Sequence, residues 1–102
     1  MTIDFEKDGT TLTVRPEGIL DSVTAPELDE QMVPQIEGMN EVILDLAKVE
    51  YISSAGLRVL VATDQAMEKR GGCMKIIHAG PYILEILDMT GLLNAFTVVS
   101  DR

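Results

Sequence analysis

The sequence predicts an α/β fold with one mixed, mostly parallel sheet and an antiparallel strand at the N-terminus. Short apolar runs alternate with stretches of helical periodicity along the chain. Residues 42–46 are apolar except for one aspartate, which is typical of a strand buried on both faces of a parallel sheet. Because 102 residues suit one core, we expect a single domain over residues 1–102 in the order β-β-α-β-α-β-α-β.

The first two strands are expected to form a hairpin. Apolar and polar residues alternate at 3–5 and again at 12–14, and Asp8-Gly9 gives a turn signal between them. Pro16 cannot donate a hydrogen bond to a neighbouring strand, so the second strand should end or bulge there.

A helix is predicted to begin near Thr24. Thr24 and Glu27 have the spacing of a capping box, and Pro26 lies in the first turn. Pro34 would remove a helical hydrogen bond, which predicts a kink or an early end at that point. The apolar residues expected on the buried face are Leu28, Met32 and Ile36.

The second half of the chain continues the alternation. A loop is expected at 48–51, after the buried strand, and a helix should begin at Ser53 or Ser54 and close at Gly71-Gly72. Strand–helix–strand units of this length form right-handed crossovers between parallel strands. The later elements are a strand at 74–78, a helix from Gly80-Pro81 to Gly91, an apolar turn at 92–93 and a strand at 96–99.

Charge and composition exclude several classes of partner. Asp and Glu number 17 against 8 Lys and Arg, and the net charge of −9 would repel nucleic-acid phosphates and anionic lipid. Aromatic residues make up only 4% and Trp is absent, which argues against a platform for stacking bases. We therefore expect neither a nucleic acid nor a membrane as partner.

Sequence signals for cofactors, metals and export are missing as well. The chain has no glycine-rich nucleotide loop and no cluster of metal ligands, so no cofactor and no metal are expected. Cys73 is the only cysteine and is predicted to be a small core residue. The N-terminus does not read as a signal peptide and no apolar run reaches transmembrane length, so a cytoplasmic location is expected.

Ser53 and Ser54 stand where a loop meets a predicted helix. The first amides of a helix lack partners within it, and at least one of these serines is expected to cap them. The same place suits a phosphorylation site, because a phosphoserine adds about −1.5 to −2 charges and a helix N-terminus tolerates an anion. Sequence spacing leaves both interpretations open.

A serine hydrolase is disfavoured. Ile52 stands where a G-x-S-x-G nucleophile elbow needs its first glycine. His78, the only histidine, lies at the end of a predicted strand, where a structural role is more common. The chain is therefore predicted not to be an enzyme.

Two aspartates follow predicted strands. Asp21 comes after the second strand, and because ligand and partner sites gather at the carboxyl ends of parallel strands, it should share an edge with Ser53 and Ser54. Its spacing favours a turn residue that bonds the local backbone. Asp45 is expected where its strand frays, bonded to loop amides.

Four blocks of the sequence, in matching order, resemble one known family. The blocks are Gly18–Asp21 with Thr24–Leu28, then Val42–Leu46, Tyr51–Leu60 and Asp88–Leu92. Together they resemble the STAS domain, and specifically the free-standing bacterial anti-sigma factor antagonists, over almost the whole chain. The resemblance implies a (βα) superhelix with a mixed sheet.

The resemblance also implies regulation of transcription by partner switching. The dephosphorylated antagonist binds an anti-sigma factor, often also a serine kinase, and frees a sigma factor; phosphorylation releases the partner, and a serine phosphatase resets the switch. The acceptor position matches Ser54, and the family's aspartate after the second strand matches Asp21. The expected partner-binding residues are Asp21, Ser22, Thr24, Ser53, Ser54, Ala55, Gly56, Leu57 and Arg58.

Two positions depart from the commonest phosphorylatable pattern. Ser53 stands where many members have Asp, and Ala55 stands where many have Ser or Thr. Ser53 therefore remains an alternative acceptor. A STAS scaffold that is never phosphorylated, or a module that senses a small ligand or nucleotide, remains an alternative function.

Overall fold

The computed structural model describes residues 1–99; residues 100–102, the end of the predicted domain, lie outside the described part. The strands in this part are β1 (Thr2–Asp8), β2 (Thr11–Leu20), β3 (Glu41–Asp45), β4 (Val49–Ile52), β5 (Cys73–Ile77) and β6 (Thr97–Val98). The helices are α1 (Thr24–Ile36), α2 (Ser54–Lys69), α3 (Pro81–Met89) and α4 (Leu92–Ala95).

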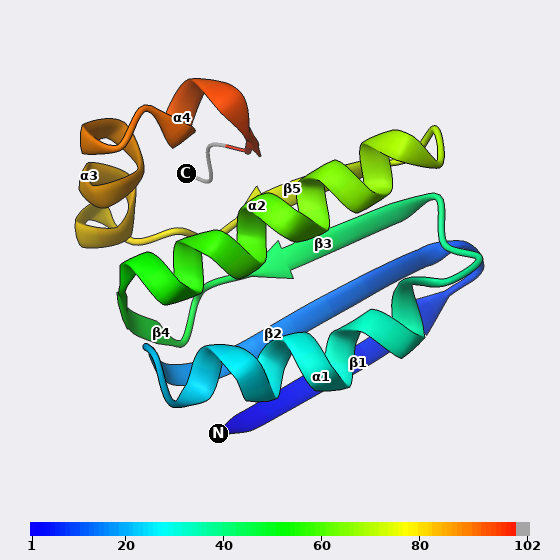
Figure 1. Cartoon of the computed structure of the whole chain (residues 1–102), viewed down its shortest axis with the longest axis horizontal. Helices are drawn as coiled ribbons and strands as arrows, with labels where there is room; N and C mark the ends of the chain where they lie inside the picture. The colour runs from blue at the N-terminus through cyan, green and yellow to red at the C-terminus, as the bar shows by residue number, and fades with distance from the viewer. Residues whose placement is uncertain (100–102) are drawn as a thin grey trace.

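The strands form one mixed sheet in the order β1-β2-β3-β5-β6, and β4 pairs with the end of β2. β1 is antiparallel to β2, whereas the other pairs are parallel. In Figure 1, α1 and α2 lie side by side across one face of the sheet, and α3 and α4 lie beyond its upper left end. The predicted α/β class, with its antiparallel N-terminal pair, is confirmed.

The structure adds two short elements to the predicted order. β4 occupies the segment expected to be a loop, and α4 extends the apolar turn expected at 92–93. In β4 the first and last residues are buried and the two between them are exposed, so the strand lacks the alternation that marks one in sequence. β4 pairs with β2 after a shift in register between Gly18 and Ile19.

Two expectations about proline were wrong in part. β2 does not end at Pro16. Residues 11–14 of β2 pair with β3 and residues 18–20 pair with β4, and Pro16 lies between these two stretches. The break in strand register comes after Gly18 instead. α1 does not end at Pro34 but continues to Ile36. Pro34 lies in the last turn on the exposed side, where the carbonyl that it leaves unbonded can meet water.

The core lies between the sheet and its two long helices. The predicted buried face of α1 is confirmed, since Leu28 and Met32 are fully buried and Ile36 is nearly so. The prediction for Cys73 was wrong: it is exposed at the start of β5, on the side of the strand opposite the buried Met74. None of the helices in residues 1–99 combines the length and the apolar character needed to cross a bilayer.

Candidate functional site

The ends of β2 and β4 bring the predicted site residues together. The two strands run parallel with Leu20 opposite Ile52, and the N–H of Ser53 donates to the carbonyl of Leu20 at 2.8 Å. The residues that follow both strands, Asp21 and Ser53, therefore leave the same edge of the sheet. This confirms the shared edge that the sequence predicts.

Asp21 organises the start of α1. Its Oδ1 accepts hydrogen bonds from the N–H of Val23 at 2.9 Å and of Thr24 at 3.1 Å. The bonds from Thr24 and then Val23 are the main reasons that the pKa of Asp21 lies below its usual range. The interpretation of Asp21 as a turn residue that bonds local backbone is confirmed.

The predicted capping box at Thr24 and Glu27 does not form. The Thr24 hydroxyl donates to the carbonyl of Ile19 at 2.6 Å, and its oxygen accepts the N–H of Asp21 at 2.9 Å. Thr24 therefore ties α1 back to the end of β2. The carboxylate of Asp21 accepts the helix-start amides instead.

The two serines occupy different environments. Ser53 precedes α2 in an extended conformation, and its Oγ is buried without a hydrogen-bond partner in the described part of the chain. Ser54 is the first residue of α2 and is exposed. The expected serine cap was wrong, because neither hydroxyl makes a capping bond on α2 within residues 1–99. Of these two serines, only Ser54 is exposed.

Gly56 fixes how closely α2 approaches the sheet. A Cβ at this position would lie 2.7 Å from Cγ1 of Ile52 and 3.0 Å from the carbonyl oxygen of Leu20. Because only a glycine permits this contact, the first turn of α2 sits directly on the ends of β2 and β4. The place of Ser54 beside the Asp21 loop follows from that packing.

The structure sorts the expected partner-binding residues by accessibility. Gly56 and Leu57 are buried on the core side of α2, so they hold the helix against the sheet and are not part of the exposed surface. The half-buried members are Asp21, Thr24, Ser53 and Ala55, and the exposed members are Ser22, Ser54 and Arg58.

Sequence reasoning missed an apolar rim at the same end of the molecule, formed by Ile19, Val23, Tyr51 and Tyr82. All four side chains are exposed, and the Tyr51 and Tyr82 rings stack with centroids 6.1 Å apart. Ile19 lies opposite Tyr51 in the β2–β4 ladder. The only available signal was two tyrosines in a chain poor in aromatics, at positions outside the apolar periodicity.

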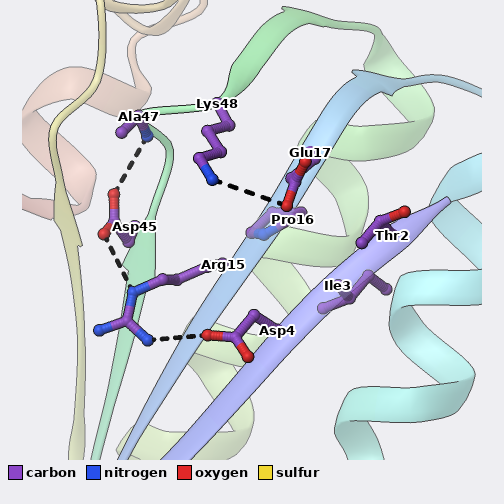
Figure 2. Close-up of a pocket in the computed structure, with 9 residues that line it drawn as sticks. All are labelled: Thr2, Ile3, Asp4, Arg15, Pro16, Glu17, Asp45, Ala47 and Lys48. Atoms are coloured by element: carbon purple, nitrogen blue, oxygen red, sulfur yellow. Dashed lines mark hydrogen bonds and ion pairs between the residues drawn. The ribbon is translucent and has the colours of Figure 1, made fainter.

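A separate charged cluster surrounds Arg15. Its guanidinium contacts Asp4 at 3.0 Å, Glu6 at 2.9 Å and Asp45 at 3.4 Å. Figure 2 shows Asp4, Arg15 and Asp45 at a cavity of about 340 Å³ between β1, β2 and the segment that leaves β3. Its lining combines apolar residues with three carboxylates and two cations.

Asp45 lies at the edge of this cavity. Its Oδ1 accepts the N–H of Ala47 at 3.1 Å and is 2.9 Å from Nδ1 of His78, which confirms the predicted bond to a loop amide. Burial acts to raise the pKa of Asp45, but the hydrogen bonds from His78 and Ala47 and the charge of Arg15 outweigh it, and the pKa is lowered.

Comparisons with known proteins agree with this architecture. The family model described as "STAS domain" matches residues 2–102. An anti-sigma-B factor antagonist of Bacillus subtilis is 30% identical over 98 residues, which cover 96% of this chain and 90% of that protein. One from Staphylococcus epidermidis is 38% identical over 86 residues, covering 83% of this chain and 80% of that protein.

A solved structure shows the same fold. The crystal structure of an anti-sigma factor antagonist from Mycobacterium paratuberculosis superposes with a TM-score of 0.86 at 28% identity, covering 98% of this chain and 86% of that one. The family match spans nearly the whole chain, and both the sheet topology and the relatives agree with it. The chain belongs to the STAS domain family.

Proposed function

We propose that this chain is an anti-sigma factor antagonist whose binding is switched by phosphorylation of Ser54. The observation that carries the proposal is the exposed Ser54 at the start of α2, beside the Asp21 loop, in a chain whose relatives are named as such antagonists. In the unmodified state the surface around Ser54 binds an anti-sigma factor that is also a serine kinase. A sigma factor is thereby freed to direct transcription in the cytoplasm.

The phosphorylation step is a transfer from ATP to the Ser54 hydroxyl. Oγ attacks the γ-phosphorus, the bond to the β-phosphate oxygen breaks, the hydroxyl proton passes to the kinase and ADP leaves. The unpartnered amides and the positive end of the α2 dipole favour the resulting anion. Ser53 is the weaker candidate acceptor, because its Oγ is buried.

A phosphate on Ser54 opposes docking for two physical reasons. It adds bulk and about −1.5 to −2 charges at the centre of a surface whose rim is apolar. It must also be desolvated when a partner covers it. Because about 1.4 kcal/mol corresponds to a tenfold change in affinity, a modest penalty releases the partner without unfolding the domain. A serine phosphatase that removes the phosphate restores binding.

A binding role suits the chain better than the alternatives. Ile52 stands where a nucleophile elbow needs its first glycine, which argues against a nucleophilic Ser54. Three carboxylates line the cavity beside Arg15 against two cations, Arg15 and Lys48, and the excess of negative charge disfavours the phosphates of a nucleotide. These features favour a partner-switching protein over an enzyme or a nucleotide sensor.

The experiment is to capture the cognate anti-sigma factor from the native host with the purified chain and to phosphorylate the chain with it and ATP. Mass spectrometry should place the phosphate on Ser54, and Ser54→Ala should abolish labelling. Ser54→Asp should weaken binding of the partner by tenfold or more in calorimetry. Equal labelling of Ser54→Ala, or unchanged affinity of Ser54→Asp, would overturn the proposal.

A further inference from the structure

Ser54 and Arg58 lie on the same exposed stripe of α2. They are four residues apart, and in a helix this spacing places the Cβ atoms about 5–6 Å from one another on one face. Both side chains are exposed, whereas Gly56, Leu57 and Leu60 face the core. Arg58 is therefore the basic residue one turn away from the hydroxyl that the proposed function modifies.

The guanidinium of Arg58 is available for a new partner. Within residues 1–99 it makes no ion pair or side-chain hydrogen bond, whereas Arg15 contacts three carboxylates and Arg70 donates to the carbonyl of Ile36 at 2.8 Å. Arg58 lines a shallow groove of about 430 Å³ between α1 and α2, which Asp29 of α1 also lines.

We propose that the guanidinium of Arg58 binds the phosphate on Ser54 within the same chain when Ser54 is phosphorylated. This inference rests on the proposed function, because it concerns the form phosphorylated at Ser54. An anion that precedes a cation by four residues has the favoured orientation on a helix. A guanidinium matches phosphate oxygens with two parallel hydrogen bonds, and the anion also meets the positive end of the α2 dipole.

The pairing changes two surfaces with one modification. The phosphate adds negative charge at the start of α2, and it also draws the guanidinium from the groove beside Asp29 toward the N-terminus of the helix. A partner that sets a carboxylate against Arg58 therefore loses an attraction at the moment that it meets a repulsion.

The test installs phosphoserine at position 54 during translation, so that no kinase is needed, and follows its ³¹P NMR signal through a pH titration. Arg58→Gln should raise the second pKa of the phosphate by about 0.15–0.4 unit relative to the unsubstituted chain, because the dianion loses its cation. In Arg58→Lys the second pKa of the phosphate should lie between the values of the unsubstituted chain and Arg58→Gln. The lysine ammonium keeps the positive charge but lacks the planar guanidinium that forms two parallel hydrogen bonds.

Lys69→Gln is the matched control. It removes the same charge from the same helix, about 22 Å from Ser54 along the axis, which is beyond the screening length in ordinary salt. An equal pKa in the unsubstituted and Arg58→Gln chains, or an equal rise in Lys69→Gln, would overturn the role of Arg58.

Failure of the proposed function would look different. If phosphorylated and unphosphorylated chains bind the anti-sigma factor with the same affinity, the switch is wrong, whatever the phosphate pKa. If phosphorylation weakens binding but Arg58→Gln leaves the second pKa of the phosphate unchanged, only the pairing of Arg58 with the phosphate is wrong.

Discussion

The backbone N–H of Ser53 donates to the carbonyl of Leu20 at 2.8 Å, and this bond joins the start of α2 to the end of β2. Asp21, the next residue after Leu20, holds the start of α1 through the N–H groups of Val23 and Thr24. The two helix starts are therefore fixed to one point of the sheet. Hydrogen bonds to the backbone of β2 hold both helix starts at the candidate site.

Gly56→Ala should destabilise the chain by about 1–3 kcal/mol, because a methyl group would press on Ile52 and on the backbone of Leu20. This loss would outweigh the gain in helix propensity that alanine brings in a helix interior. Unfolding in urea measures the difference. Gly80→Ala is the control for the added bulk, since a Cβ there meets nothing within 4 Å and φ is negative; as the N-cap of α3 it should lose no more than about 1 kcal/mol. If both variants lost the same free energy of unfolding, the close approach of α2 to the sheet at Gly56 would be contradicted.

Ser53→Ala should leave stability unchanged or raise it by up to about 1 kcal/mol, because it removes a buried hydroxyl that has no partner within the described residues. A serine that caps a helix behaves in the opposite way and costs about 1 kcal/mol when replaced by alanine. Thermal and urea unfolding separate the two cases. A clear loss of stability would show that the Ser53 hydroxyl caps α2 in solution.

Asp21 should contribute to the pH dependence of stability. Its pKa is lowered in the folded state, so its contribution is present above the unfolded-state pKa, near 3.8, and is lost as the pH falls through the lower folded-state value. Asp21→Asn should therefore show a smaller fall in unfolding midpoint between pH 7 and pH 2 than the unsubstituted chain. Identical midpoint changes in the two chains would contradict a charged Asp21 at the start of α1.

The apolar rim should contribute to binding of the anti-sigma factor. Tyr82→Ala should weaken the complex by tenfold or more while changing stability by less than about 1 kcal/mol, because exposed aromatic side chains often anchor protein interfaces. Calorimetric titration measures the affinity. Met89→Ala, at the other end of α3 and also exposed, is the control. If Tyr82→Ala and Met89→Ala bound the anti-sigma factor with the same affinity, Tyr82 would not be part of the interface.

The sequence was informative where local signals and tertiary structure agree. Leu28, Met32 and Ile36 repeat with the helical period and are buried together in α1. Asp21 follows a predicted strand, and Ser53 ends the loop predicted after the next strand, so their shared edge could be expected. Elements of this kind depend on periodicity and strand order, which a single sequence contains.

Other features depend on contacts that a single sequence does not contain. β4 is recognised by its pairing with β2 and not by its own four residues, of which Glu50 and Tyr51 point outward. Serine is a common N-cap residue, but the Ser53 hydroxyl is buried and makes no capping hydrogen bond within the described residues. Cys73 is small and apolar, yet it falls on the outer face of β5 because of the strand's register.

The placement of Cys73 has a practical consequence. It is the only thiol in the chain, it is exposed, and it begins β5, whose first residues lie beside the starts of β3 and β2. Ser54 follows the opposite end of that sheet, roughly 30 Å away for a strand of ten residues. A fluorophore attached there by maleimide chemistry would sit far from the candidate site, so binding could be followed by fluorescence polarisation without adding a cysteine.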